Sequence, residues 1–388
     1  MLESCMAMAE ATRGDTTGAS AAPPLFAFLS GRQKLVGHGM ARALPPGPAA
    51  TLAERVAAFF RGAGADMVLA GALPFERAAE DHLVQARQVS STTPAAAPLL
   101  PSPRWTLRPD PVPEAFAQAV AAALGEMAKG NLQKVVLSRS LLAEADRPID
   151  LPGLLHRLAA DSSVTAFLVP LPAPEGAPRF LAGATPELLI AKKGRAILSH
   201  PLAGSARRQA DTAADCAAAT ALERSDKDRR EHALVAEFVL DTLAPYCRTL
   251  SAPEGTRLTT TATLWHLGTR IAGELKDADI SSAALAAALH PTPAVCGLPR
   301  EASARLISQL EPYDRGFYAG AVGWCDGRGD GEWHVSIRCA EIAGRQARLY
   351  AGAGIVPGSD PAAETAETAA KFRAFLRALG VEAEERCA

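Results

Sequence analysis

Two pairs of acidic residues stand three positions apart in stretches with helical spacing. Glu364 and Glu367 follow a glycine-rich run, and Asp228 and Glu231 lie within residues 225–243. Residues one turn apart project from the same side of a helix, so each pair would present two carboxylates in one direction. Mg²⁺ takes one or two carboxylates and fills its shell with water and substrate oxygens. One prediction is therefore a Mg²⁺ site shared by two helices.

Each pair also has a simpler interpretation. Glu367 and Lys371 have the i,i+4 spacing of an exposed salt bridge. Asp228 could complete a capping box with Ser225 at the start of a helix. Glu231 is harder to assign to a surface, because it falls at the centre of the apolar stripe of its helix, where an unpaired carboxylate is costly to bury.

The glycine run before the last helix does not match a nucleotide loop. Gly352, Gly354 and Gly358 are spaced one residue wider than the dinucleotide fingerprint, and Pro357 lies inside the turn. Glycines in this pattern are typical of a turn, or of a backbone that approaches a ligand closely.

Four further polar residues stand beside apolar strands. Lys134 begins a strand of Val and Leu, Glu187 follows a proline before an apolar strand, and Arg338 interrupts an apolar strand. By themselves, a solvent-reaching lysine and a turn glutamate are the simpler interpretations, whereas an arginine in a strand usually meets a carboxylate of protein or ligand. His266 has no visible partner and resembles a structural histidine.

The elements that must position these residues are strands in meandering groups and a few helices. Helical patterns cover residues 113–130, about 213–243 with a possible break near Ser225, and the end of the chain. The strands do not alternate strictly with helices, so we expect an α+β fold with a largely antiparallel sheet. Residues 91–114 contain seven prolines and form either a domain linker or a surface connection. Residues 1–24 are small and polar, and we expect them to be disordered.

Composition limits the class of protein. The chain has 388 residues, a net charge of −2 and seven scattered cysteines. The charge argues against nucleic-acid binding, and the cysteines argue against a disulfide framework or a zinc site. No apolar run approaches the ~20 residues that span a bilayer, and no signal peptide is evident. We expect a cytoplasmic protein without membrane contact, and a monomer.

Taken together, these segments resemble the chorismate-utilising enzymes, which include anthranilate, aminodeoxychorismate, salicylate and isochorismate synthases. The motifs occur in the order of that family, from about Lys134 to Lys371: KVVLSRS, GATPELL, HPLAGSARR, SDKDRREH, LWHLGTRIAGEL, HPTPAVCGLP, YAGAVGW, SIRCAE and YAGAGIVPGSDPAAETAETAAK. The resemblance implies one large α+β domain over residues 25–388, with a two-layered, mostly antiparallel sheet core and helices outside. Residues 25–113 would complete the sheets, and residues 114–388 would carry the active site.

The resemblance also implies roles for individual residues. Glu231 and Glu367 would bind Mg²⁺ directly, and Asp228 and Glu364 would hold metal-bound waters. The substrate chorismate, and the product isochorismate, would be contacted by nine residues: Gly204, Ser205, His266, Ala294, Val295, Tyr318, Arg338, Gly352 and Lys371.

Isochorismate forms when water adds at C2 of chorismate while the 4-hydroxyl departs. This reaction needs a base on one side of the ring and an acid on the other, and the resemblance makes Lys134 the base and Glu187 the acid. A lysine that acts as a base must lose its proton near pH 7, which burial or a nearby cation favours.

Within the family, the pattern is most similar to isochorismate synthases of siderophore pathways. Ammonia-using members lack a lysine at position 134, and salicylate synthases typically have threonine where this chain has Ala294 next to Val295. Tyr318 points the other way, because tyrosine occurs there in salicylate synthases. The alternatives are a salicylate synthase, a menaquinone-pathway isochorismate synthase, and a non-catalytic chorismate-binding relative.

Overall fold

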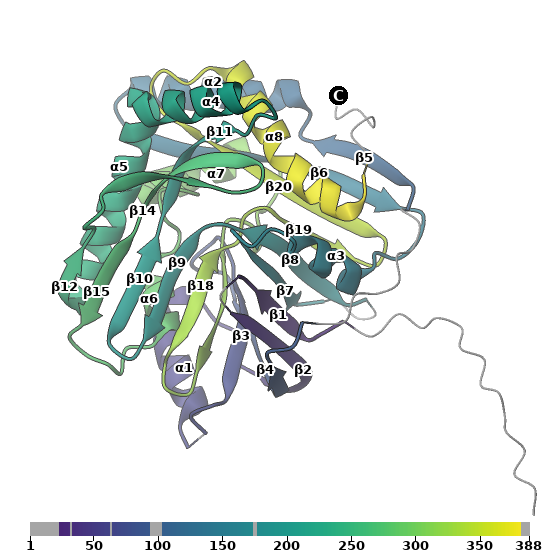
Figure 1. Cartoon of the computed structure of the whole chain (residues 1–388), viewed down its shortest axis with the longest axis vertical. Coiled ribbons are helices and arrows are strands. Elements are labelled where there is room, and N and C mark those ends of the chain that lie inside the picture. Colours follow the sequence, from purple (N-terminus) through teal and green to yellow (C-terminus); the bar gives the residue numbers. More distant parts are fainter. Residues whose placement is uncertain (1–22, 32, 63, 94–102, 174–176, 382–388) are drawn as a thin grey trace, which may run out of the picture.

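Long antiparallel strand pairings organise the molecule, which we describe from a computed structural model (Figure 1). The described residues are 23–31, 33–62, 64–93, 103–173 and 177–381. The expectation for residues 1–24 therefore lies almost entirely outside them.

Seventeen strands of the described residues form one continuous sheet, in which every pairing is antiparallel. In chain order the strands are β1 (Phe26–Leu29), β2 (Lys34–Ala43), β3 (Val68–Leu73), β4 (His82–Ser90), β5 (Trp105–Asp110), β6 (Lys134–Ala145), β7 (Thr165–Leu171), β8 (Arg179–Thr185), β9 (Leu188–Lys193), β10 (Ala196–His200), β12 (Cys247–Ser251), β15 (Ile271–Leu275), β16 (Gly297–Leu298), β17 (Ala321–Asp326), β18 (Gly331–Val335), β19 (Cys339–Ala343) and β20 (Gln346–Ile355). This architecture confirms the predicted α+β class with a mostly antiparallel sheet.

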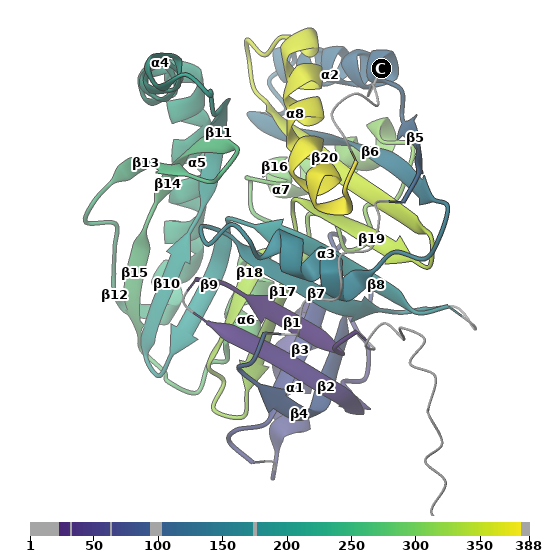
Figure 2. The ribbon, with the colours of Figure 1, turned by 45° about the vertical axis from the view of Figure 1, so that its right-hand side comes forward.

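A second sheet joins β11 (Leu202–Arg207), β14 (Leu264–Thr269) and β13 (Thr256–Thr260). Two helices pack on it, α4 (Thr212–Arg224) and α5 (Asp226–Leu243). They are separated at Ser225, as the sequence predicted, and the Ser225 hydroxyl accepts a hydrogen bond from the Asp228 backbone N–H to cap α5. Figure 2 shows both helices to the left of α8 (Pro361–Leu379), which packs on the large sheet.

The remaining helices cover the outside of the large sheet. Helix α8 packs along β20, with α2 (Pro113–Ala128) and α3 (Leu151–Leu158) beside it. Helix α7 (Arg300–Leu310) packs on β6 and β16. At the other end of the molecule, α6 (Ser282–Leu289) covers β9 and β18, and α1 (Leu52–Phe60) lies against α6 (Figures 1 and 2).

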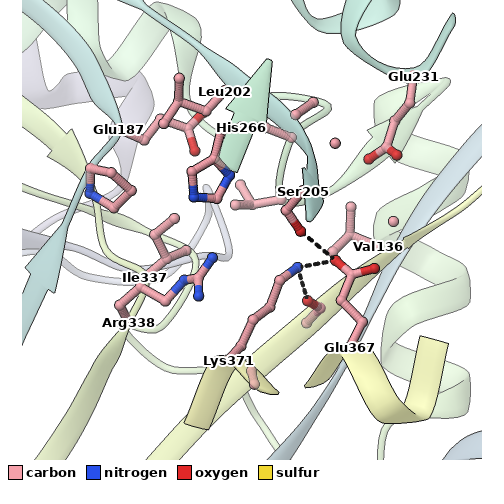
Figure 3. A pocket seen from close by; sticks show the side chains of 18 of the residues that line it. Val136, Glu187, Leu202, Ser205, Glu231, His266, Ile337, Arg338, Glu367 and Lys371 are labelled. Carbon is pink, nitrogen blue, oxygen red and sulfur yellow. Dashed lines mark hydrogen bonds and ion pairs between the residues drawn. The ribbon is translucent and has the colours of Figure 1, made fainter. Parts of the chain in front are cut away.

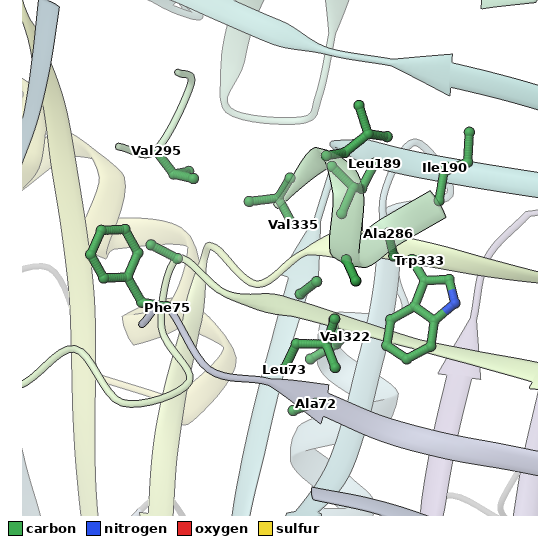
Figure 4. Packing of buried hydrophobic residues seen from close by; sticks show 14 of the residues in the cluster. Ala72, Leu73, Phe75, Leu189, Ile190, Ala286, Val295, Val322, Trp333 and Val335 are labelled. Carbon is green, nitrogen blue, oxygen red and sulfur yellow. The ribbon is translucent and has the colours of Figure 1, made fainter. Parts of the chain in front are cut away.

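The largest hydrophobic cluster lies between the layers of the folded sheet. Phe26 and Phe167 from one part of the sheet are fully buried in the same cluster as Ile190 and Trp333 from another. Figure 4 shows Ile190 and Trp333 in this cluster. A second cluster lies under α3 and α8 and includes Phe372. The two clusters hold β20 and α8 in fixed positions, and these elements carry much of the acidic site predicted from the sequence.

One strand prediction was wrong. The stretch around Arg338 is not one strand but two, β18 and β19, which pair with β9 and β8 respectively. Arg338 lies in the connection with a φ of 52°, a left-handed conformation that few non-glycine residues adopt. Residues 105–110 of the proline-rich stretch pair with β6 as an edge strand, whereas residues 94–102 lie outside the described residues. In the part of the chain that the structure covers, no helix has the length and apolarity needed to cross a bilayer.

Candidate active site

One cavity of about 90 Å³ collects most of the predicted site residues between α5, the small sheet, β20 and α8 (Figure 3). Every predicted residue except Lys134 and Glu364 lines it. These two residues form ion pairs with residues that do line it, Lys134 with Glu231 and Glu364 with Lys227. Its walls come from turns and elements spread along the chain: β6, the Pro186–Glu187 turn, β11, α5, β14, the turn before β16, the loop before β17, the Arg338 connection, β20 and α8.

Three of the four predicted acids form ion pairs with lysines. Glu231 pairs with Lys134 at 3.0 Å and Glu364 with Lys227 at 2.7 Å. Glu367 pairs with Lys371 at 2.5 Å. The simpler interpretation of the Glu367–Lys371 spacing is thus correct for the contact itself, although both residues also line the cavity.

Burial and neighbouring charges make the four carboxylates unequal. Burial raises the pKa of Glu364, although Lys227 opposes this effect. Burial also raises the pKa of Asp228, against the opposing effects of the Ser225 hydroxyl and Lys227. Burial also acts on Glu367, but Lys371, Lys227 and the Ser205 hydroxyl together outweigh it and hold the pKa of Glu367 below its ordinary value.

Lys134 does not reach solvent, so the simpler interpretation of this residue was wrong. It begins β6 with its side chain completely buried, and its Nζ lies 3.0 Å from Oε1 of Glu231. The geometry of that contact makes no hydrogen bond, and Nζ has no hydrogen-bond partner among the residues that the structure describes. A completely buried lysine whose amine has no hydrogen-bond partner is rare unless a ligand or a reaction requires it.

Glu187 is equally removed from solvent, at 3% exposure, in the turn between β8 and β9. Burial raises its pKa to about 7, against the lowering effects of a hydrogen bond from the Leu202 backbone and of the nearby cations Lys134, Arg338 and Lys371. At neutral pH a substantial fraction of this carboxyl group therefore holds a proton that it can donate.

Arg338 and His266 form the wall next to Glu187 (Figure 3). Burial lowers the pKa of Arg338, while Glu367, Tyr318 and Glu187 oppose that effect. Burial lowers the pKa of His266 to about 3, so its imidazole is neutral at physiological pH. The left-handed backbone at Arg338 is the kind of local strain that often accompanies a functional residue.

The glycines bring backbone close to these side chains. Gly352 accepts a hydrogen bond of 2.8 Å from Lys371 through its carbonyl. A methyl group at Gly354 would overlap the Glu231 carboxylate. A methyl group at Gly204, where φ is 74°, would come close to the side chain of Asp228. The glycine run thus serves the close approach that the sequence offered as one of two interpretations.

Sequence reasoning missed several lining residues, of which Lys227 and Tyr350 are the most informative. Tyr350 stacks on Tyr318 with ring centroids 4.7 Å apart and planes 7° apart. Nothing local distinguishes Tyr350 from any buried strand tyrosine. Lys227 directly precedes Asp228, and this position next to a predicted metal-binding acid was the available signal.

Whether the site suits a metal ion is decided by its donor set. Asp228, Glu231, Glu364 and Glu367 offer the oxygen ligands that Mg²⁺ prefers, and the first, second and fourth of them line one cavity. In the described ranges no three His, Cys, Asp or Glu side chains converge as a ready metal site, because lysines pair with three of these acids. The chemistry of the residues fits the ion, and the ion pairs would have to open to admit it.

Comparisons with known proteins point to one family. The family model described as "Chorismate binding enzyme" matches residues 65–380. The isochorismate synthase DhbC of Bacillus subtilis is 41% identical over 93% of this chain and 94% of its own length. The isochorismate synthase EntC of Escherichia coli is 39% identical over 94% and 97%.

Solved structures agree with this similarity. A putative 2,3-dihydroxybenzoate-specific isochorismate synthase from Bacillus anthracis superposes with a TM-score of 0.87 at 39% identity, over 92% of this chain and 97% of the other. Anthranilate synthase component I from Streptococcus pneumoniae superposes with a TM-score of 0.68 over 95% of each chain, and at 18% identity this likeness concerns the fold alone.

Proposed function

This chain belongs to the family of chorismate-binding enzymes, and on that premise we propose that it is an isochorismate synthase. It converts chorismate to isochorismate by adding water at C2 while the 4-hydroxyl leaves. One water is taken up and one is released, so the product is an isomer of the substrate. The observation that carries this proposal is a completely buried lysine, Lys134, in the same site as a carboxyl group with a pKa of about 7, Glu187.

In the proposed mechanism the two residues act on opposite sides of the ring. Lys134 takes a proton from the attacking water, and Glu187 gives a proton to the departing hydroxyl. The pKa of Glu187 supports this role, because a general acid works best when its pKa is near the operating pH. Arg338 and Lys371 would orient the substrate carboxylates, since both are cations at the cavity wall.

We also propose that the enzyme uses Mg²⁺, held by Glu231 and Glu367 directly and by Asp228 and Glu364 through water. When bound, the ion would neutralise one substrate carboxylate and so fix the ring. The charge of the site supports a divalent cation. The four acids stand among three cations, Lys227, Arg338 and Lys371, while Lys134 must be neutral to act as the base. A substrate with two carboxylates would therefore leave negative charge uncompensated.

The test is to incubate the purified protein with chorismate and Mg²⁺ and to identify the products by mass and chromatography. We expect a product isobaric with chorismate that elutes apart from it and forms reversibly without pyruvate. We also expect Lys134→Ala and Glu187→Gln to abolish turnover while chorismate still binds. Near-normal turnover in either variant would remove the roles given to these residues.

A salicylate synthase is the second candidate, because Tyr318 lines the cavity. Salicylate with stoichiometric pyruvate in the same assay would establish it, and binding without turnover would indicate a non-catalytic relative. We propose that the product enters a siderophore pathway, because DhbC and a vibriobactin-specific isochorismate synthase are among the relatives. The cytoplasmic location and the monomeric state stay predictions.

A further inference from the structure

A buried ion pair lies directly behind one wall of the site and has no part in the mechanism above. Glu311, the residue that ends α7, and Arg315 are 8% and 3% exposed. Two hydrogen bonds join them, from Arg315 Nη2 to Glu311 Oε1 at 2.6 Å and from Nε to Oε2 at 2.9 Å. A buried pair of this kind adds little net stability compared with apolar residues of similar volume, so its other contacts show what it does.

The other donors of Arg315 bind the backbone of two residues that line the cavity. Nη1 donates to the carbonyl of Val295 at 2.8 Å, and Nη2 donates to the carbonyl of Val136 at 2.7 Å. Val295 lies in the turn before β16 and Val136 lies in β6, so one guanidinium joins two walls of the site. Its flat face also rests on the ring of Phe75, 4.4 Å from the centroid. Figure 4 shows Val295 and Phe75 in the same part of the core.

The other member of the pair, Glu311, binds the same strand, β6, at a second residue. Glu311 Oε1 accepts hydrogen bonds from the backbone N–H of Ser138 at 2.7 Å and from its hydroxyl at 2.9 Å. The Ser138 hydroxyl also lies 2.9 Å from the hydroxyl of Tyr313. Because Ser138 is two residues beyond Val136 in β6, the ion pair determines the position of that strand segment.

The pair also contacts a third segment of the cavity wall, the one that carries Tyr318. The backbone N–H of Tyr318 donates to the carbonyl of Arg315 at 2.9 Å, and the guanidinium lies 5.8 Å from the Tyr318 ring centroid. Tyr318 is 3% exposed, lines the cavity and stacks on Tyr350. The ion pair therefore contacts three segments that line the cavity, those of Val136, Val295 and Tyr318, without lining the cavity itself.

We propose that Arg315 and Glu311 are positioning residues that hold Val136, Val295 and Tyr318 at a fixed spacing and thereby set how tightly the ring of chorismate is bound. This inference rests on the proposed function for the identity of the ligand. Contacts made equally in the ground state and the transition state change KM and leave kcat nearly unchanged. The pair therefore controls KM, whereas Lys134 and Glu187 control kcat.

The experiment is to compare Arg315→Lys with a matched control, Arg55→Lys. Arg55 forms a similar ion pair with the buried Asp81 and also donates to backbone carbonyls, those of Pro45 and Gly47. It lies on α1, at the other end of the molecule from α8 (Figures 1 and 2). Lysine keeps the charge but cannot reach two carbonyls and a carboxylate at once.

We expect Arg315→Lys to raise both KM and the calorimetric Kd for chorismate by about 10-fold, with kcat within about 3-fold of wild type, because small misplacements of binding groups have effects of this order. Arg55→Lys should lose comparable stability in urea denaturation and leave KM and Kd within about 2-fold. The proposal is overturned if Arg315→Lys folds and binds chorismate as tightly as the control does.

If Arg315→Lys does not fold, Ser138→Ala replaces it, because this change removes one hydroxyl from the network and keeps the backbone donor to Glu311. We expect it to raise Kd by roughly 3-fold, and an unchanged Kd would refute the proposal. Wild-type turnover is measured first. If the wild type makes no isochorismate, the proposed function has failed, and the Kd comparison still tests the positioning role by itself.

Discussion

At the scale of the residue, burial gives Glu187 a chemistry that its sequence context does not reveal. The same side chain in an exposed turn would be fully ionised at neutral pH, whereas here its pKa is about 7. The completely buried Lys134 belongs to the same site. In the proposed mechanism these two groups are the base and the acid, and both side chains are buried.

The pKa of Glu187 predicts how activity depends on pH. If Glu187 is the general acid, kcat/KM should fall as pH rises through about 7, because the free enzyme then loses the proton that the leaving hydroxyl needs. A pH–rate profile in non-coordinating buffers at saturating Mg²⁺ checks this. A rate that stays constant up to pH 9 would contradict the acid role.

The same shift has a consequence for stability that does not depend on turnover. Because the folded-state pKa is raised from 4.5 to about 7, the favourable contribution of protonated Glu187 is fully present below pH 4.5 and is lost as pH rises through 7. The loss amounts to roughly 3 kcal/mol at most. Glu187→Gln cannot titrate, so its unfolding free energy relative to wild type should increase between pH 5 and pH 8. Equal pH dependence in urea denaturation of the two proteins would show that Glu187 is not shifted.

At the scale of the element, two helices and one glycine-rich strand assemble the acidic part of the site. Helix α5 presents Asp228 and Glu231, and helix α8 presents Glu364 and Glu367. Strand β20 passes between them with Gly354 directly under the Glu231 carboxylate. The missing side chain is what lets the strand and the acid share that space.

Gly354→Ala tests this relation between strand and helix. The new methyl would displace the flexible end of Glu231 and leave the backbone in place, so we expect the unfolding free energy to change by no more than about 1 kcal/mol. If Glu231 binds Mg²⁺ as proposed, the Mg²⁺ concentration for half-maximal activity should rise at least ~10-fold, because the methyl would move that carboxylate. Glu231→Ala and Glu367→Ala should weaken Mg²⁺ dependence and chorismate binding together.

Gly125→Ala in α2 is the control, since a Cβ at this exposed position has no neighbour within 4 Å. It should stabilise the helix by about 1 kcal/mol without any effect on Mg²⁺. A Mg²⁺ titration curve of Gly354→Ala that matches the wild type would mean that Glu231 does not bind the ion.

At the scale of the whole molecule, the site lies between the small sheet and the large sheet, with residues from both in its walls. Its walls include β11 and β14 of the small sheet, α5 packed on them, and β20 and α8 of the large sheet. The cavity of about 90 Å³ lies where these parts of the fold meet.

A ligand that fills this site should therefore stabilise the molecule against global unfolding. We expect chorismate with Mg²⁺ to raise the unfolding free energy by about 2.7 kcal/mol when the ligand is present at 100 times its Kd. A thermal-shift titration measures this, with NAD as the comparison because the glycine run superficially resembles a dinucleotide loop. A shift with NAD as large as that with chorismate would favour a different ligand class.

The sequence by itself determined the features that depend on short-range pattern. Helical periodicity placed Glu231 within an apolar stripe, and the break at Ser225 followed from local capping chemistry. The order of motifs was sufficient to identify the family and its antiparallel α+β fold. The extent of the single domain, and the division at residue 113, stay predictions.

Only the tertiary structure decided which polar residues are buried and what they meet. Lys134 could have reached solvent from the end of a strand, and its burial depends on α5, which brings Glu231 to it from a distant part of the chain. The sequence predicted that Arg338 interrupts one strand. In the structure it occupies a left-handed connection between two strands that pair with different neighbours. At Lys134 and Arg338, burial and strand pairing are set by contacts between residues far apart in the chain, which the local pattern at these two positions does not determine.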